Sequence, residues 1–248
     1  MPAPDSYTIL ITGAGSGLGH GLSLYFAATG HRGLATDKCA ESVKATATEA
    51  GANVTDFELD VSSHAQIAAF GDSLGGRRVE VLVNNAGRHD FRRTTEVTEA
   101  EWEHDLALNL SGPFYCAQSA IPHLLEAPDG GGTIVNVASV AGLMGEAYSA
   151  AYTAAKHGVV GLTKALAVEH LKQPLRVNCV CPGGMDTPQV QTIGVPDDAD
   201  WDLIMRVAAT RGLMSADNVA AAICFLASND AAAVNGSIHA VDAGRTAG

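Results

Sequence analysis

The chain has 248 residues, of which 47% are hydrophobic and 17% charged, and its formal net charge is −12. This length and apolar content suit one α/β domain spanning residues 1–248, because no linker, repeat or low-complexity tract divides the sequence. The negative charge argues against nucleic acid and anionic lipid as partners. Neither a leader-type N-terminus nor an apolar run of about 18 residues is visible, so we expect a cytoplasmic protein without a membrane partner.

The five cysteines and nine histidines do not indicate a metal centre. An odd cysteine count, with most cysteines in apolar stretches, is typical of reduced thiols in the cytosol. Cys179 and Cys181 are separated by one residue of an expected strand, so their side chains share a face. A metal pair there is conceivable, but no second pair has ligand spacing, and we predict no metal.

A glycine-rich turn is the first informative motif. An apolar run at residues 7–11 ends at TGAGSGLG, residues 12–19, and helical periodicity follows to residue 30. Glycines let the backbone turn tightly and approach a pyrophosphate, and the following helix N-terminus offers free N–H groups and a positive dipole end. The order strand, turn, helix therefore predicts a dinucleotide site.

The second expected strand, residues 31–36, indicates which dinucleotide binds. It ends at Asp37, which follows the last glycine of the turn by 18 residues. A carboxylate at that position accepts hydrogen bonds from both ribose hydroxyls and repels a 2′-phosphate. Lys38 and Arg32 add positive charge nearby, whereas Ser16 in the turn adds none. The charges favour NAD over NADP as the cofactor.

Polar residues follow the next two strands. The expected elements are a helix at residues 41–50, a strand at 53–59, a helix at 62–74 and a strand at 79–83. Asp60 lies at the edge where an adenine binds, or it N-caps the helix that follows. The tetrapeptide NNAG, residues 84–87, ends the later strand. The Asn84 amide either ties neighbouring strands together or contacts the cofactor.

A long helix is expected at residues 98–125, with an irregular hydrogen-bond ladder near Asn109. Gly112 and Pro113 lie inside this helix. Proline removes a backbone donor and glycine loosens the turn, so the regular ladder is disturbed. An asparagine at such a place can hold a water molecule.

Residues 139–156 carry the candidate chemistry. The expected strand at residues 133–138 ends at Ser139, and a helix continuing to about residue 171 places Tyr152 and Lys156 on one face, four residues apart. A nearby cation favours the phenolate, so we expect the pKa of Tyr152 to fall from its ordinary value of about 10. A phenol tuned in this way can act as an acid and a base.

The last third of the chain completes an alternation of strands and helices. The expected elements are strands at residues 175–181 and 237–241, helices at 201–209 and 216–227, and a lid at 185–212. Seven alternations predict an α/β fold with a doubly wound parallel sheet and helices on both faces. Every motif falls at or just beyond the carboxyl end of a strand, where open parallel sheets bind their ligands.

These motifs resemble those of the compact branch of the short-chain dehydrogenase/reductase family. TGAGSGLG matches that branch's TGxxxGxG, NNAG its tetrapeptide at the sheet edge, and PGGMDT its PG-containing segment. Its catalytic tetrad is matched by Asn109, Ser139, Tyr152 and Lys156. The resemblance covers nearly the whole chain. It implies a single-domain Rossmann fold, a homotetramer, and a small-molecule alcohol or carbonyl substrate.

The resemblance also implies roles for individual residues. Tyr152 would be the acid/base, Ser139 would position the substrate oxygen, and Asn109 would support a water-linked proton relay. Lys156 would hold the nicotinamide ribose and lower the pKa of the tyrosine. The implied cofactor-binding residues are Gly13, Ser16, Gly17, Leu18, Gly19, Asp37, Asp60, Val61, Asn85, Ala86, Gly87, Tyr152, Lys156, Pro182, Gly183 and Thr187.

We therefore predict an NAD-dependent oxidoreductase that interconverts a secondary alcohol and a ketone by hydride transfer, with Tyr152 as acid/base. Two alternatives stay open. An NADPH-dependent 3-oxoacyl-type reductase is disfavoured by Asp37 and by the acidic turn at residues 126–129. A dinucleotide-binding protein without turnover is disfavoured because both Tyr152 and Lys156 are present.

The substrate pocket is open to several interpretations. An apolar pocket could be formed by Leu143, Met144, Tyr148, Met185 and Met205. Three arginines that follow NNAG, namely Arg88, Arg92 and Arg93, either meet a substrate carboxylate or belong to a solvated loop. Four aspartates at positions 197, 198, 200 and 202 crowd the expected lid and argue against an anionic substrate.

Overall fold

Seven parallel strands form one sheet in the computed structural model, which describes residues 6–128, 131–206 and 212–247. The strands lie in the order β3-β2-β1-β4-β5-β6-β7. Their bounds are β1 (Thr8–Thr12), β2 (Arg32–Asp37), β3 (Val54–Glu58), β4 (Val81–Asn84), β5 (Gly132–Val137), β6 (Leu175–Pro182) and β7 (Ile238–Val241). The predicted doubly wound, single-domain Rossmann fold is confirmed.

The strand order creates a switch point beside β1. Leu10 of β1 lies opposite Leu34 of β2 on one side and opposite Leu82 of β4 on the other. The chain runs from β1 through β2 to β3 at one edge of the sheet and then crosses back to β4 on the other side of β1. The connections that follow β1 and β4 therefore lead toward opposite edges of the sheet. In open α/β sheets, ligands bind in the crevice at the carboxyl ends of the strands there.

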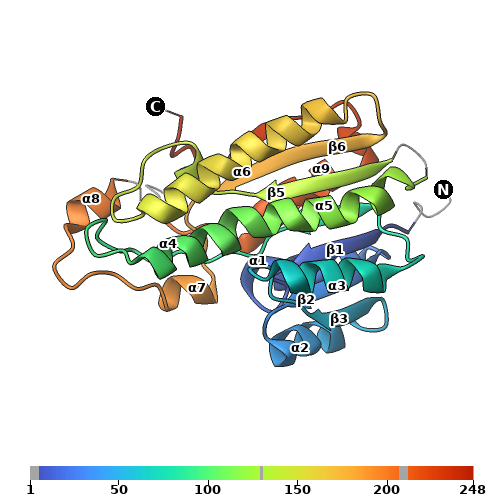
Figure 1. The fold of residues 1–248 in the computed structure, drawn as a ribbon, viewed down its shortest axis with the longest axis horizontal. Helices are drawn as coiled ribbons and strands as arrows, with labels where there is room; N and C mark the ends of the chain where they lie inside the picture. Colours follow the sequence, from blue (N-terminus) through green and yellow to red (C-terminus); the bar gives the residue numbers. More distant parts are fainter. Residues whose placement is uncertain (1–5, 129–130, 207–211, 248) are drawn as a thin grey trace.

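Side chains alternate along β1 and feed two separate cores. Ile9 and Ile11 pack with α1 (Gly17–Ala28), α2 (Ala40–Ala50) and α9 (Ala216–Ala227), whereas Leu10 packs with α3 (His64–Leu74), α5 (Gly112–Leu125) and α6 (Ala150–Glu169). Burying each such side chain contributes about 1.5–3 kcal/mol, so both faces of the sheet hold it in place. Figure 1 shows α3, α5 and α6 in front of the strands.

The expected long helix at residues 98–125 is divided in the structure. It consists of α4 (Glu99–Leu106), a π-helical turn (Ala107–Ser111) and α5. The Thr98 hydroxyl and the Glu101 carboxylate form a capping box at its start. The irregularity therefore begins before Gly112 and Pro113 and includes Asn109 itself, which is consistent with the expected disturbance near that residue. Wide turns of this kind often mark functional sites.

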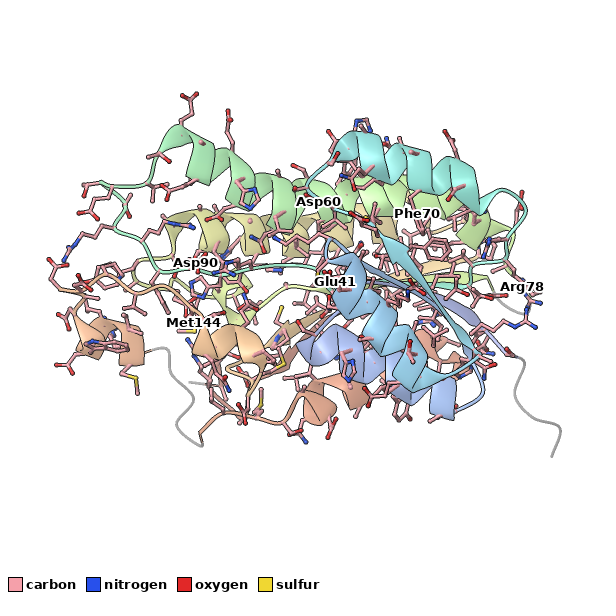
Figure 2. The ribbon with its side chains drawn as sticks, turned by 90° about the horizontal axis from the view of Figure 1, so that it is seen from below. Glu41, Asp60, Phe70, Arg78, Asp90 and Met144 are labelled. Atoms are coloured by element: carbon pink, nitrogen blue, oxygen red, sulfur yellow. The ribbon has the colours of Figure 1, made fainter. Side chains whose placement is uncertain are left out.

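The segment after β6 lies beyond the edge of the sheet at which the carboxyl ends of the strands meet (Figure 1). It contains two short helices, α7 (Pro188–Gln191) and α8 (Trp201–Met205). The helix expected at residues 201–209 thus ends at Met205, and residues 207–211 of the expected lid lie outside the described residues. The same is true of residues 1–5 and of residue 129 in the acidic turn. In Figure 2, Asp90 and Met144 lie toward the end of the molecule that carries α8, and Arg78 lies toward the opposite end.

The cysteines match the expectation of free thiols. Cys116, Cys179 and Cys181 are buried, and the Sγ atoms of Cys179 and Cys181 lie 3.9 Å apart on one face of β6. Within the described residues, His, Cys, Asp and Glu side chains nowhere gather in threes as metal ligands would. None of the described helices has the length and apolar character needed to cross a bilayer.

Candidate active site

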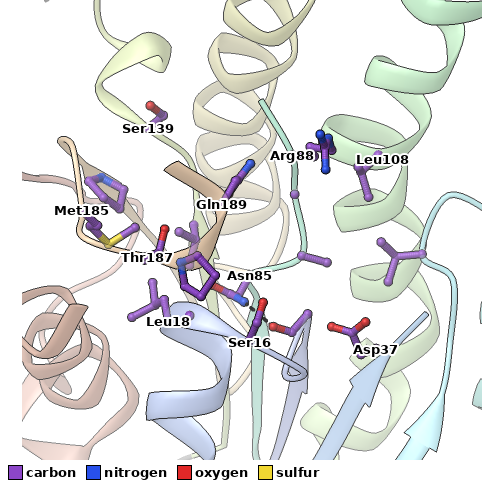
Figure 3. Close-up of a pocket in the computed structure, with 18 of the residues that line it drawn as sticks. Ser16, Leu18, Asp37, Asn85, Arg88, Leu108, Ser139, Met185, Thr187 and Gln189 are labelled. Carbon is purple, nitrogen blue, oxygen red and sulfur yellow. Dashed lines mark hydrogen bonds between the residues drawn. The ribbon is translucent and has the colours of Figure 1, made fainter. Parts of the chain in front are cut away.

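A cleft of about 430 Å³ runs along the carboxyl ends of the strands at the switch point. Figure 3 shows Asp37 near the glycine-rich turn and Ser139 at the opposite end of the cleft. Ser139 lines it, and so do fifteen of the predicted cofactor residues, namely Gly13, Ser16, Gly17, Leu18, Asp37, Asp60, Val61, Asn85, Ala86, Gly87, Tyr152, Lys156, Pro182, Gly183 and Thr187. Two predicted residues, Gly19 and Asn109, lie behind its wall.

The glycine-rich turn packs so closely that side chains are excluded at two positions. Gly13 has φ +67°, and a Cβ on it would lie 2.8 Å from the Ala86 Cα atom. A Cβ on Gly19 would meet the Gly13 carbonyl oxygen and lie 2.6 Å from Asn85 Nδ2. The Asn85 amide donates to the Thr12 and Gly13 carbonyl oxygens at 2.9 and 3.1 Å. The turn is therefore held by the segment after β4, across the switch point.

Asp37 lies at the end of β2 and faces the turn. Its Oδ2 accepts a hydrogen bond from the Gly15 N–H at 3.0 Å, and its Oδ1 accepts one from the Cys39 N–H at 3.0 Å. These two bonds fix the orientation of the carboxylate. Lys38, the next residue, also lines the cleft. Asp37 therefore lies at the cleft, as its position after β2 predicts.

Two residues that had alternative interpretations now have defined contacts. The Asn84 amide donates to Asn136 Oδ1 at 2.9 Å and to the Pro113 carbonyl oxygen at 3.1 Å, so it ties neighbouring elements together beneath the cleft. Asp60 Oδ1 accepts from the Ser62 N–H and hydroxyl. The N-cap of α3 is Ser63, so the interpretation of Asp60 as the N-cap was wrong. A tight turn separates Asp60 from the start of the helix, which begins three residues later than that interpretation required.

Tyr152 and Lys156 share one face of α6, as their spacing predicts. Lys156 Nζ lies 5.6 Å from the centre of the Tyr152 ring and donates to the Val137 carbonyl oxygen at 3.0 Å. The Lys156 side chain is buried, with 3% of the residue exposed. Ser139 lies across from the phenol, and its Oγ accepts from the Ala141 N–H at 3.1 Å. Hydroxyl, phenol and ammonium thus converge at one end of the cleft.

The expected fall in the pKa of Tyr152 is not present in the structure. Burial raises the pKa of the Tyr152 phenol, and a hydrogen bond with Ser139 only partly opposes this effect. Burial also lowers the pKa of Lys156 to about 8. Both shifts have the same cause, because a site poor in water penalises the charged form of either group. The prediction of a lowered pKa took into account the positive charge of Lys156. It left out the burial of the Tyr152 phenol, which has the larger effect.

Asn109 forms hydrogen bonds with the backbone of Arg88, which directly follows NNAG. Its Nδ2 donates to the Arg88 carbonyl oxygen at 3.0 Å, and its Oδ1 accepts from the Arg88 N–H at 3.2 Å. A Cβ on Gly87 would lie 2.9 Å from Asn109 Oδ1 and 3.3 Å from Lys156 Nζ. The π-helical turn therefore brings Asn109 to the wall behind Gly87, where it fixes the strand extension that faces Lys156.

His89 is a site residue that the sequence analysis missed. Its imidazole stacks on the Tyr152 ring, with centroids 4.4 Å apart and planes inclined by 21°. Its Nε2 lies 2.7 Å from Ser149 Oγ and 3.9 Å from Glu146 Oε2. The one signal in the sequence was its position two residues after NNAG, which is not by itself informative.

The pKa of His89 predicts a pH dependence of stability. Burial lowers this pKa from 6.5 to about 4. Between these values the unfolded chain holds a proton that the folded chain lacks, so stability falls as the pH falls, by up to about 1.4 kcal/mol per pH unit. His89→Phe keeps an aromatic ring and removes this contribution. Urea unfolding at pH 7, 6 and 5 measures the free energy of unfolding of both proteins. As the pH decreases, this free energy should fall less in the variant than in wild type. A constant difference would contradict the assignment.

The three arginines after NNAG are all paired with the protein's own carboxylates. Arg88 Nε lies 2.9 Å from Asp90 Oδ2, and Arg92 Nη1 lies 3.0 Å from Asp105 Oδ2. Arg93 Nη2 lies 2.6 Å from Asp198 Oδ2. Asp198 belongs to the acidic segment of the expected lid, whereas Asp90 and Asp105 lie outside it, so the acidic segment neutralises Arg93 and the other two arginines are neutralised elsewhere.

The predicted apolar pocket is mostly absent. Of its five residues, Met185 lines the cleft, whereas Met205 and Leu143 are 59% and 39% exposed. The Tyr148 hydroxyl accepts from the Asp200 N–H at 2.9 Å and therefore faces the lid. Met144 does not line the cleft either.

A parallel sheet with a glycine-rich turn at the switch point is the architecture of dinucleotide-binding proteins. Comparison with known proteins narrows this class. Residues 13–246 match a family model described as enoyl-(acyl carrier protein) reductase. The chain belongs to the short-chain dehydrogenase/reductase family and is an oxidoreductase of that family.

The relatives resemble the chain over almost its full length. Meso-2,3-butanediol dehydrogenase from Serratia marcescens is 35% identical over 246 residues, covering 98% of this chain and 96% of that protein. D-threitol dehydrogenase from Mycolicibacterium smegmatis is 35% identical, covering 98% and 94%. The crystal structure of 3-ketoacyl-(acyl-carrier-protein) reductase from Brucella melitensis complexed with NADH has a TM-score of 0.85 at 30% identity, covering 97% and 98%.

Proposed function

We propose that the protein interconverts a secondary alcohol and a ketone of a small molecule, with NAD as the hydride carrier. The convergence of Ser139, Tyr152 and Lys156 at one end of a cleft that begins at the glycine-rich turn carries this proposal. A screen of secondary alcohols, diols and hydroxy acids with NAD⁺ and NADP⁺, read at the nicotinamide absorbance, tests it. Absence of turnover with every alcohol and both cofactors would refute it.

The roles of the residues follow from their positions. A nicotinamide held beside Lys156 would supply the acceptor for the hydride of the carbinol carbon in oxidation and its donor in reduction. Tyr152 removes the hydroxyl proton, and the Ser139 hydroxyl holds the same oxygen in place by a hydrogen bond. Lys156 compensates the developing phenolate charge in a site where burial otherwise raises the pKa of Tyr152. Asn109 keeps the Arg88 backbone, and hence Gly87, in position beside Lys156.

The contacts of Asp37 support NAD as the cofactor. Its carboxylate is held by the Gly15 and Cys39 N–H groups at the end of the cleft opposite Ser139. A 2′-phosphate brought to that place would meet a fixed negative charge, whereas ribose hydroxyls would donate to it. The adjacent Lys38 offers attraction to a phosphate, but it does not remove the carboxylate.

Asp37→Ala is expected to weaken the use of NAD and to relieve the exclusion of NADP. The change removes two ribose contacts and one repulsive charge, so the ratio of kcat/KM for NAD to that for NADP should fall by about 10²-fold. Both values are measured at saturating alcohol. Asp56→Ala, on the neighbouring β3, serves as the matched control and should leave the ratio unchanged. An unaltered ratio in Asp37→Ala would contradict the hypothesis that Asp37 binds the ribose of the cofactor.

The alternatives have weaker support. An NADPH-dependent 3-oxoacyl-type reductase would need to tolerate Asp37 at the ribose and would have to attract an acidic carrier to a chain with net charge −12. A dinucleotide-binding protein without turnover would have no use for Tyr152 and Lys156 at the cleft. The Brucella melitensis structure, named as a 3-ketoacyl-(acyl-carrier-protein) reductase complexed with NADH, is the observation that favours an acyl substrate.

We also propose that the protein is a cytoplasmic homotetramer that packs through α5 and α6. Phe114 on α5 and Val168 on α6 are 40% and 67% exposed, which leaves apolar surface for a partner helix. Ala154 and Gly161 are exposed on α6, where small side chains permit close approach. Gly158 is different, because a Cβ there would lie 2.8 Å from the Leu110 side chain of the same chain.

A further inference from the structure

The contacts of His89 favour one of its two neutral tautomers. Ser149 Oγ lies 3.2 Å from the Ala147 carbonyl oxygen, to which its hydroxyl can donate, and 2.7 Å from His89 Nε2, from which it then accepts a hydrogen bond. The other neighbour of Nε2 is Glu146 Oε2, at 3.9 Å, which is also an acceptor. In this arrangement the proton lies on Nε2, and Nδ1 keeps a free lone pair.

His89 keeps this arrangement at neutral pH. Burial holds its pKa at about 4, so the ring is uncharged and Nδ1 remains an acceptor. No described residue donates a hydrogen bond to Nδ1, and this nitrogen is not among the polar atoms sealed from solvent. The side chain as a whole is 12% exposed. An accessible acceptor in an otherwise buried ring needs a donor from a bound molecule or from water.

The acceptor lies beside the reacting group. The His89 and Tyr152 rings stack at 4.4 Å, and Gly87, two residues before His89, lines the cleft next to Lys156. A small molecule whose carbinol oxygen meets the Tyr152 hydroxyl therefore has its neighbouring carbon close to the imidazole. A hydroxyl on that carbon can donate to Nδ1, whereas a methyl group leaves Nδ1 unpaired.

We propose that His89 is a specificity-determining residue whose Nδ1 accepts a hydrogen bond from a second substrate hydroxyl, next to the carbinol carbon. This inference rests on the proposed function and names its substrate class: vicinal diols and polyols in oxidation, and α-hydroxy ketones in reduction. The names of two relatives, a meso-2,3-butanediol dehydrogenase and a D-threitol dehydrogenase, agree with such a substrate.

The test compares 2,3-butanediol with 2-butanol, which differ by one hydroxyl. We expect wild type to favour the diol in kcat/KM by at least about tenfold, since an unmet hydrogen bond costs that much. His89→Phe keeps a stacking ring without an acceptor, and its loss on the diol should exceed its loss on 2-butanol by about the same factor. His89→Asn carries an amide oxygen near the place of Nδ1 and should retain part of the preference.

Two outcomes would overturn the inference. One is a wild-type ratio near one. The other is an equal loss on both alcohols in His89→Phe and His89→Asn, which would mean that His89 acts through Tyr152 alone. If wild type oxidises neither these two alcohols nor any other alcohol of the screen with NAD⁺ or NADP⁺, the proposed function fails by itself. Titration calorimetry of both alcohols onto the NAD-loaded protein then decides: selective diol binding that His89→Phe abolishes supports the inference, and equal binding refutes it.

Discussion

Tyr152→Phe should lower kcat/KM for alcohol oxidation by about 10²- to 10⁴-fold, which is the contribution that a positioned acid/base group makes. Phenylalanine keeps the ring that stacks on His89 and faces Lys156, so the change removes the hydroxyl alone. The affinity for NAD, measured by fluorescence titration, should stay close to that of wild type. A loss of rate without a loss of cofactor binding separates the chemical role from a structural one.

The pH dependence of wild type extends this prediction. Burial raises the pKa of Tyr152, so the phenolate that accepts the proton in oxidation is more populated at alkaline pH. Oxidation should therefore accelerate as the pH rises, whereas reduction, which needs the protonated phenol, should be favoured at lower pH.

Tyr25→Phe, on the exposed side of α1, is the matched control for Tyr152→Phe. Wild-type rates in Tyr152→Phe would refute the assignment.

Gly19→Ala is expected to disrupt the dinucleotide site. The added Cβ would meet the Gly13 carbonyl oxygen and lie 2.6 Å from Asn85 Nδ2, so the turn must move away from α1. Forcing such an overlap costs about 1–3 kcal/mol. We expect a lower melting temperature and NAD binding weakened at least about tenfold, measured by fluorescence titration and by thermal unfolding with and without NAD.

Gly21→Ala provides a control on the same helix. A Cβ on Gly21 has no atom within 4 Å, and alanine favours a helix over glycine by about 0.5–1 kcal/mol. This variant should melt slightly higher than wild type and bind NAD equally well. If Gly19→Ala behaved in the same way as Gly21→Ala, the close packing of the turn would have no part in cofactor binding.

The features that the sequence predicted well are those with local causes. Strand and helix periodicity fixed the seven alternations, and the order of parallel strands brought their carboxyl ends to one edge, as Asp37 and Ser139 illustrate. Helical spacing put Tyr152 and Lys156 on one face. Each of these conclusions needed only the geometry of a single element or of a parallel sheet.

The features that were missed depend on contacts between distant segments. His89 meets Tyr152 across a separation of more than sixty positions in the chain, and Arg93 meets Asp198 across 105. Burial of the phenol, which reverses the expected pKa shift, likewise arises from several elements together. Spacing within one helix contains no information about such neighbours. Desolvation and ion pairing could therefore be assigned only from the folded chain.

The two ends of the cleft are built from separate stretches of the chain. The turn, Asp37, Asp60 and Val61 all precede the return to β4, whereas Gly87, Ser139 and Tyr152 all follow it. Asp37, on which the proposed choice of dinucleotide rests, lies in the earlier stretch, so substitutions around Ser139 can alter which compound reacts without touching that carboxylate. Such a division allows a lineage to diversify its metabolism by changing one half of its gene, and it gives a protein engineer a natural boundary for making chimaeras.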